Sequence, residues 1–170
     1  MSYAYASIVQ MKKMLENLDR WLDESSAYAT KKSFDPNILL TQRLAPDQYP
    51  LVRQIQSACD TAKFAAARLT GKEAPRHPDT ETTMDLIRSR IRAVVTHLET
   101  YTADDFKDAD KRRVDLPFME GKSMHGADYV VEMAQPNFYF HLNHAYAILR
   151  NNGVSLGKQG YIGSLKMFDR

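Results

Sequence analysis

Apolar residues recur at helical spacing along most of the chain, in four long segments. The first covers about residues 2–27, with Ser2 as its expected N-cap, and its apolar residues stand three and four positions apart: Ile8, Met11, Leu15, Leu18 and Leu22. The second covers roughly residues 47–70, with Gly71 as its expected stop. Most residues on its apolar face are small, which lets a neighbouring helix approach closely.

Two further segments complete the helical pattern. The third begins near Thr82, which forms a capping-box pattern with Asp85. The fourth begins after Gly126 and ends at Gly153, and Pro136 inside it is expected to kink or divide the helix. Amphipathic helices bury their apolar stripes most simply against one another, so the sequence predicts an all-α four-helix bundle.

Shorter elements are expected between the long helices. Asp35 followed by proline predicts a short helix over residues 37–44, and residues 102–106 resemble a short capped turn. Apolar and other residues alternate within residues 111–125, which predicts a small β-hairpin before the last helix. The glycine-containing end of the chain, residues 154–170, is interpreted as coil.

The composition predicts one cytoplasmic domain, residues 1–170. The chain has 170 residues, 44% of them hydrophobic, and a net charge of +2. The densest basic run, residues 111–113, is short, so no nucleic-acid partner is predicted. Neither a signal peptide nor an apolar stretch of about 20 residues is present, which argues against a membrane location. The single cysteine, Cys59, permits no intrachain disulfide, as is usual in a reducing cytosol.

Two histidines three residues apart, His141 and His144, are the main candidates for chemistry. On a helical wheel His141 lies about 70° from the centre of the apolar face, so it is expected to point into the bundle. His144 lies nearer the margin, where it shares an edge with Asn137. Gln54 lies at the edge of the apolar stripe of the second helix. We therefore predict a small-molecule pocket lined by His141, Asn137 and Gln54.

A metal site is the alternative interpretation of the histidine pair. Two side chains three apart on a helix can reach one metal ion, so His141 and His144 are candidate ligands for Zn, Ni or Fe. A catalytic zinc needs a third protein ligand, and the second helix contains no histidine. It offers Gln54, Gln56 and Cys59, and a lone buried cysteine more often packs as a small hydrophobe. The residues alone therefore identify no certain cofactor and no catalytic residue.

Two long blocks of sequence resemble a known family. They are "RLAPDQYPLVRQIQSACDTAKFAAARLTG", residues 43–71, and "PNFYFHLNHAYAILRNNGVSLGKQGYIG", residues 136–163. Both are similar to a bacterial domain-of-unknown-function family within the DinB-like (YfiT-like) superfamily of proposed metalloenzymes. The resemblance implies a DinB-type four-helix bundle, often assembled as a dimer. It also implies that metal-binding members use one histidine of helix two and two histidines, four apart, of a later helix, and that some are thiol-dependent transferases or isomerases.

The sequence departs from that metal-binding pattern. Helix two has no histidine, and the later pair is spaced by three, so only His141, in "FYFH", carries over from the resemblance. The first hypothesis is a homodimeric bundle protein with a small-molecule pocket and an incomplete or absent metal site. The second is a metal-dependent enzyme of the thiol transferase, isomerase or hydrolase type. Whether the protein is an enzyme stays open at this point.

Overall fold

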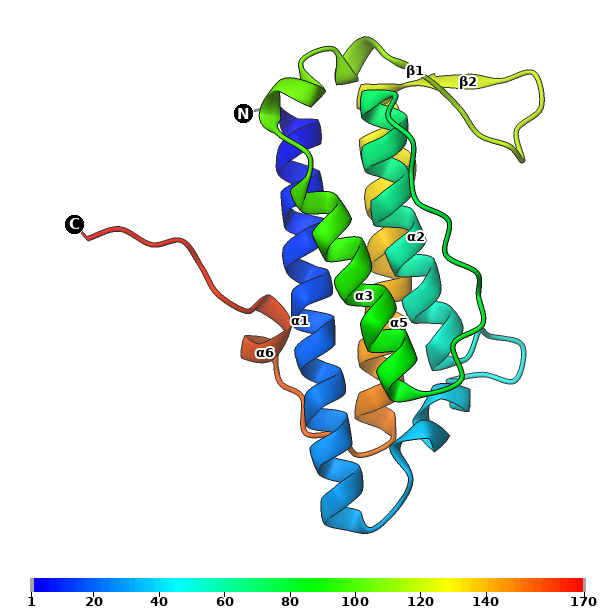
Figure 1. The fold of residues 1–170 in the computed structure, drawn as a ribbon, viewed down its shortest axis with the longest axis vertical. Helices are drawn as coiled ribbons and strands as arrows, with labels where there is room; N and C mark the ends of the chain where they lie inside the picture. The colour runs from blue at the N-terminus through cyan, green and yellow to red at the C-terminus, as the bar shows by residue number, and fades with distance from the viewer. Residues whose placement is uncertain (1, 170) are drawn as a thin grey trace.

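Four long helices pack into an all-α bundle, which confirms the fold class predicted from the apolar pattern. The structure is a computed structural model, and it describes residues 2–169. Its long helices are α1 (Tyr3–Lys32), α2 (Leu51–Thr70), α3 (Met84–Glu99) and α5 (Gln135–Asn151). Helix α2 contacts both α3 and α5, and α1 contacts each of the other three (Figure 1).

Short elements connect and extend the long helices. They are the 3₁₀ helices η1 (Pro36–Thr41), η2 (Ala103–Phe106) and η3 (Ala109–Lys111), the strands β1 (Arg113–Asp115) and β2 (Ser123–His125), and the helices α4 (Gly126–Asp128), η4 (Tyr129–Ala134, a π-helix) and α6 (Lys158–Ile162). The two strands pair antiparallel, with Val114 opposite Met124. The predicted short helix, capped turn and hairpin are thus all confirmed.

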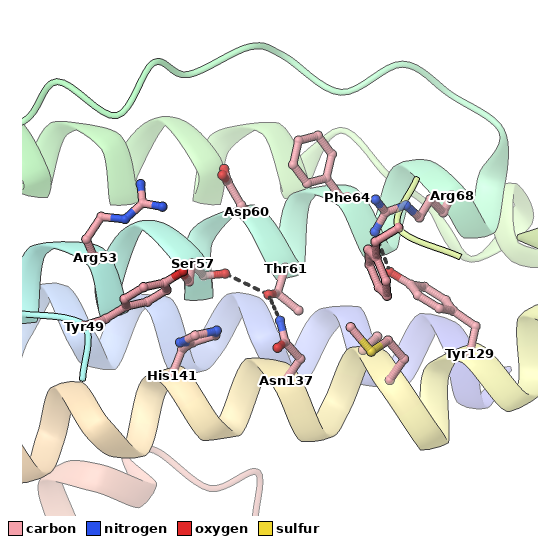
Figure 2. Close-up of a pocket in the computed structure, with 13 residues that line it drawn as sticks. Tyr49, Arg53, Ser57, Asp60, Thr61, Phe64, Arg68, Tyr129, Asn137 and His141 are labelled. Carbon is pink, nitrogen blue, oxygen red and sulfur yellow. Dashed lines mark hydrogen bonds between the residues drawn. The ribbon is translucent and has the colours of Figure 1, made fainter. Parts of the chain in front are cut away.

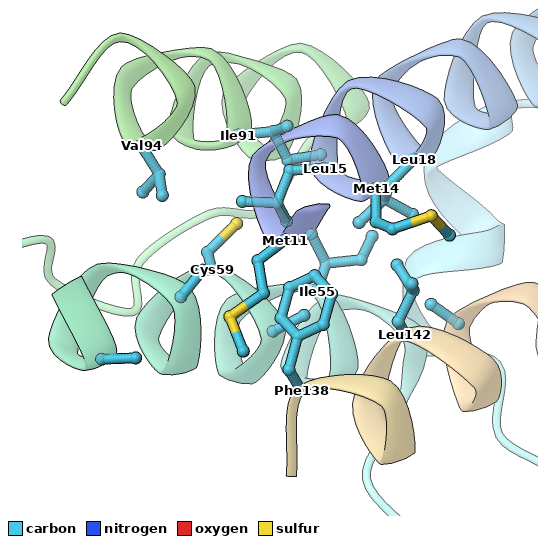
Figure 3. Packing of buried hydrophobic residues seen from close by; sticks show 14 of the residues in the cluster. Met11, Met14, Leu15, Leu18, Ile55, Cys59, Ile91, Val94, Phe138 and Leu142 are labelled. Carbon is cyan, nitrogen blue, oxygen red and sulfur yellow. The ribbon is translucent and has the colours of Figure 1, made fainter. Parts of the chain in front are cut away.

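The core lies between the four helices (Figure 3). Large apolar side chains from each helix are fully buried in it: Met11, Leu15, Leu18, Ile55, Ile91, Val94, Phe138 and Leu142. Helix α2 adds the small buried residues Ala58, Ala62, Ala65 and Ala66. Because these side chains are short, neighbouring helices can approach α2 closely, as its sequence predicted.

Three predicted helix boundaries are wrong by a few residues, each for a local reason. Helix α1 continues past residue 27 and stops where Ser33 adopts a left-handed φ of 56°. Helix α2 begins at Leu51 and not near residue 47, because Tyr49 precedes a proline and so avoids the helical region. Helix α3 is capped by Thr83, whose side chain accepts the backbone N–H three residues on, and not by Thr82.

The fourth predicted helix is divided near Pro136, as expected. The π-helix η4 comes first and α5 follows from Gln135, because proline has no N–H to donate to the preceding turn. The wider π turn changes which side chains face the core. Val131, which a continuous wheel places at the centre of the apolar face, is 53% exposed, whereas Tyr129 is buried. The π turn therefore places Tyr129 in the core and Val131 outside it.

The end of the chain is not all coil, because α6 docks on α1. The indole of Trp21 donates to the Gly160 carbonyl at 3.1 Å, and the Asn17 amide donates to the Tyr161 carbonyl at 2.8 Å. The Tyr161 ring stacks on Trp21 with centroids 5.4 Å apart. Beyond Gly163 the chain extends away from the bundle (Figure 1). The sequence predicted coil for this segment, because the bonds that hold α6 join residues far apart in the chain and leave no local pattern.

Helices α2 and α3 run in the same direction although they are consecutive (Figure 1). Residues 71–83 must therefore return along the length of α2, whose 20 residues rise about 30 Å. We call residues 71–83 the crossover loop. None of its residues is buried, so apolar packing does not hold it in place.

A buried arginine of α3, Arg90, holds the second half of the crossover loop. It is 4% exposed, and one terminal nitrogen of its guanidinium lies 2.9 Å from a carboxylate oxygen of Asp79 and 3.1 Å from one of Glu81. Its other terminal nitrogen lies 2.8 Å from Asp60 of α2. One side chain thus links α3, α2 and the loop.

Two more cations of α2 extend this ion cluster. Lys63, 1% exposed, lies 2.8 Å from Asp60 and 3.2 Å from Nδ1 of His77 in the loop. Arg53 pairs with Asp79. Burial alone would raise the pKa of Asp79, but the hydrogen bond from Arg53 and the charge of Arg90 hold that pKa below its ordinary value. The stabilisation from Asp79 is therefore lost as the pH falls below the ordinary carboxyl range.

Replacing Arg90 should weaken the fold far more than replacing its exposed neighbour. In Arg90→Met the loop carboxylates lose their buried partner, so we expect the free energy of unfolding in urea to fall by about 3–5 kcal/mol. Arg92→Met is the matched control, because Arg92 pairs with Asp19 at the surface and is 61% exposed. It should cost about 1 kcal/mol or less. Equal losses in the two variants would contradict a structural role for the buried cluster.

Candidate functional site

A groove lies between α2 and α5, with a cavity volume of about 300 Å³. Two rows of side chains face each other across it (Figure 2). The α2 row follows intervals of four, four, three and four residues: Arg53, Ser57, Thr61, Phe64 and Arg68. The opposite row follows intervals of four: Tyr129, Met133, Asn137 and His141. Because the rows run in opposite directions, His141 lies near the Arg53 end and Tyr129 near the Arg68 end.

The imidazole of His141 is held in one tautomer. Its Nδ1 lies 2.8 Å from Oε1 of Gln54, and the Gln54 amide nitrogen donates to the Tyr49 carbonyl at 3.1 Å. Since that bond fixes the amide, the oxygen faces His141, and Nδ1 must carry the proton. The other ring nitrogen, Nε2, is then left with its lone pair. The Tyr49 ring lies nearly parallel to the imidazole, with centroids 6.4 Å apart.

His141 is neutral across the physiological pH range. Burial lowers its pKa from 6.5 to about 4, and the nearby charges of His144, when protonated, and Arg53 act in the same direction. The unfolded chain binds this proton more readily than the folded one. The stabilisation of the folded state by neutral His141 is therefore complete at pH values above the ordinary pKa of 6.5. It is lost as the pH falls from 6.5 toward about 4.

Neutral hydrogen bonds join the two helices in the middle of the groove. The Asn137 amide donates to the Thr61 hydroxyl at 2.7 Å, and that hydroxyl donates to the Ser57 carbonyl at 2.7 Å (Figure 2). Asn137 stands four residues before His141, the spacing at which the family resemblance implies a second histidine. Here an amide occupies that position.

The far end of the groove holds a cation between aromatic rings. The Arg68 guanidinium donates to the Tyr129 hydroxyl at 3.1 Å and lies 5.4 Å from the centre of the Phe64 ring and 5.9 Å from that of Tyr129. Phe118, from the segment between the two β-strands, also lines the groove and is 67% exposed. This end therefore combines positive charge with apolar surface.

His144 does not line the groove. Its Nδ1 lies 2.6 Å from the Phe140 carbonyl and so donates to it, which leaves Nε2 to accept from the Gln48 amide at 3.2 Å. Both ring nitrogens are thus already bonded. Among residues 2–169, no group of three or more His, Cys, Asp or Glu side chains is arranged to hold a metal ion. The His141 and His144 pair stays a prediction without a third ligand.

The residues of α2 that could replace a histidine as metal ligands, Gln54, Gln56 and Cys59, are bonded elsewhere or buried. The Gln54 oxygen accepts from His141, and Gln56 bonds to Glu81 at 2.7 Å in the ion cluster. Cys59 is fully buried, and burial raises the pKa of its thiol to about 12. A thiol held protonated in the core is neither a nucleophile nor a metal ligand at neutral pH.

The structure brings the predicted pocket residues together, with one difference. Asn137 and His141 line the groove, whereas Gln54 is buried behind the imidazole and orients it. Sequence reasoning missed Arg68 and Tyr129. The regular spacing of polar residues along α2 was the available signal for Arg68, and no comparable signal marked Tyr129, because the π turn places it.

A family model and solved structures match this chain. The family model described as "Domain of unknown function (DUF1993)" matches residues 3–162. The crystal structure of a DinB family member protein from Shewanella denitrificans at 1.83 Å resolution has a TM-score of 0.94 and 44% sequence identity, and the match covers 98% of this chain and 95% of that one. No curated protein matches the chain. The family match includes all the residues of the groove.

The tautomer and pKa of His141 can be tested by NMR of its imidazole nitrogens. We expect a protonated Nδ1, an unprotonated Nε2 and no titration between pH 6 and pH 8, values well above the folded pKa of about 4. Gln54→Glu would place a carboxylate beside Nδ1 and should raise the pKa of His141 by about one unit or more. Gln159→Glu, on the exposed part of α6, should leave it unchanged. Ordinary titration near 6.5 in the unmodified protein would contradict this arrangement.

Proposed function

The chain belongs to the family described as Domain of unknown function (DUF1993) and shares the fold of a DinB family member, and from this premise we propose that it binds a small organic molecule in the groove between α2 and α5. The observation that carries the proposal is the bond from His141 Nδ1–H to Gln54, which leaves Nε2 as an acceptor on a groove-lining ring. The cavity of about 300 Å³ is at the lower end of the range of ligand pockets. The ligand would present an O–H or N–H to Nε2.

The chemistry of the groove favours binding over acid–base catalysis. A general base works best when its pKa lies near the working pH, and the pKa of His141 is about 4. Such an imidazole accepts a hydrogen bond at neutral pH but seldom takes the proton. Cys59, the one thiol of the chain, is buried and protonated. Neither group therefore supplies the activated base or nucleophile of a typical small-molecule enzyme.

A homodimer is part of the proposal. Its support is exposed apolar surface outside the core: Val131 of η4 and Phe140 of α5 are each 53% exposed. Apolar side chains outside the core often mark subunit contacts. No helix among residues 2–169 is long and apolar enough to cross a membrane. The mass of the protein in solution tests the dimer.

The second candidate function is a metal-dependent enzyme of the thiol transferase, isomerase or hydrolase type. One observation favours it: metal-bound histidines commonly donate their other N–H to a carbonyl oxygen, as His141 does to Gln54. A bound divalent metal would supply an activated water or thiol. The residues beside His141 do not fit such an ion, however, because they are the Asn137 amide one turn earlier on α5 and the Thr61 hydroxyl of α2, which are bonded to each other.

Phenol and anisole form a matched pair of probes for the groove. Both have one flat ring, but only phenol can donate to His141 Nε2. We expect phenol to shift the Nε2 resonance saturably and anisole to shift it much less. Ser57→Phe should block the response by filling the groove, whereas Ser89→Phe, at an exposed position of α3, should not. If phenol moves all histidine resonances alike, or none, the proposed function fails.

Metal content separates the two candidate functions. We expect protein purified without chelator to contain far less than one equivalent of Zn, Ni or Fe, and added zinc to leave the His141 Nε2 resonance unchanged, because a single imidazole makes a weak site. His141→Ala and His97→Ala serve as the test and control variants. One equivalent of metal that disappears only in His141→Ala would support the enzyme instead.

A further inference from the structure

We infer that the Arg68 end of the groove is a subsite for the anionic group of a small aromatic or otherwise apolar acid, a carboxylate or a phosphate ester. This inference deepens the proposed function, on which it rests, by naming the chemical class of the ligand. It depends on three features of this end: an unpaired cation, an available hydroxyl donor and an apolar wall.

Arg68 is the groove cation without an acidic partner. Within residues 2–169, no carboxylate oxygen lies within 4.0 Å of its guanidinium, whereas Arg53 at the other end pairs with Asp79. Among the described residues, its side chain makes one hydrogen bond, which it donates to the hydroxyl of Tyr129. A guanidinium has several N–H donors in a planar fork that matches the oxygens of a carboxylate or phosphate. Most of these donors remain available to a ligand.

The Tyr129 hydroxyl supplies a second donor at the same place. Because it accepts from Arg68, its own hydrogen is directed elsewhere, and the described residues offer it no acceptor. The Tyr129 residue is 1% exposed, so its ring is fixed by packing. It lies in the π-helix η4, and π turns are frequent at functional sites. An anion between Arg68 and Tyr129 would accept from both.

Aromatic rings hold the cation in place and form the wall beside it. Phe64 and Tyr129 flank the guanidinium, which restricts its motion and displaces water from its faces (Figure 2). Met133 and Phe118 line the groove next to them. A free inorganic anion would leave this apolar surface in water, so the ligand should carry an apolar body next to its charge.

Asp60, the acidic residue that lines the groove, does not strongly repel an anionic ligand. Asp60 lies 2.8 Å from Lys63 and 2.8 Å from Arg90, so its charge is already balanced. It stands two helical turns from Arg68, about 12 Å along α2. The groove therefore has a cationic end at Arg68, a neutral middle at Asn137 and Thr61, and an acceptor at His141.

The probes for this subsite are 3-phenylpropionate, its uncharged amide 3-phenylpropanamide, phenyl phosphate and inorganic phosphate. Affinities are measured by titration calorimetry in every variant, and the Nε–H resonance of Arg68 in ¹⁵N-labelled full-length protein reports where the ligand binds in the unmodified protein. We expect both organic anions to bind at least about tenfold more tightly than the amide, since a charged hydrogen bond to Arg68 is lost in the amide. Inorganic phosphate should bind more weakly than phenyl phosphate. The two organic anions compared with each other identify the preferred anion.

Variants at Arg68 give the second arm of the test. Arg68→Gln should weaken binding of the acids roughly tenfold or more without affecting the amide, and Arg68→Lys should fall between, because it keeps the charge but not the planar fork. Arg76→Gln, at an exposed arginine of the crossover loop, is the matched control. Urea unfolding of each variant confirms that the fold is retained, as expected for a half-buried side chain.

Three results would overturn the inference: equal affinity for acid and amide, unchanged affinity in Arg68→Gln, or no response of the Arg68 resonance to either organic anion. The phenol response at His141, recorded in the same samples, separates this failure from that of the proposed function. If His141 responds and Arg68 does not, the groove binds small molecules and only the anion subsite is wrong. If neither responds, both proposals are wrong.

Discussion

The parallel course of α2 and α3 is the constraint on which the rest of the structure depends. Two consecutive helices can run the same way only if the chain between them returns along the bundle, and here residues 71–83 make that return with no buried residue. Ion pairs take the place of apolar packing: Arg90 and Lys63 bring the loop acids and His77 against α2. A buried ion pair gives little net stability over an apolar pair of the same shape, but it tolerates few other arrangements. The cluster therefore fixes the position of the loop more than it strengthens the fold.

The same cluster orders one edge of α2, and the groove lies next to that edge. Asp60 belongs to both, since it lines the groove while its carboxylate is bonded to Lys63 and Arg90. Arg53 also belongs to both, because Asp79 of the loop holds it beside Tyr49. Helix α2 thus has an apolar face of small residues toward the core, an ionic edge toward the loop and a polar edge toward α5. The groove charges are oriented by contacts made outside the groove.

The sequence predicted what depends on neighbours along the chain, and missed what depends on distant partners. The presence of the helices and the hairpin, and the inward direction of His141, follow from the spacing of apolar and polar residues over short stretches of the chain. The partner of Nδ1 does not, because Gln54 lies 87 residues earlier in the chain. Likewise the spacing of Arg88 and Arg92 along α3 gives no indication that both bond to Asp19 of α1. The π turn of η4 is a local feature with no local signature in the sequence. A regular helical wheel therefore does not predict that Val131 is exposed and Tyr129 is buried.

The electrostatics of the groove connect its form to its preferred ligand. A site for a divalent cation gathers lone pairs and negative charge at one point, and the middle of this groove instead has amide and hydroxyl donors already bonded to each other. Its lining cations, Arg53 and Arg68, stand near the two ends, and its one lining acid is neutralised by the cluster behind α2. An elongated organic acid would find a guanidinium for its charge, rings for its apolar body and an imidazole nitrogen for a terminal donor. The lining charge without an acidic partner among the described residues is therefore that of Arg68, and this is the physical basis for preferring an anion over a cation.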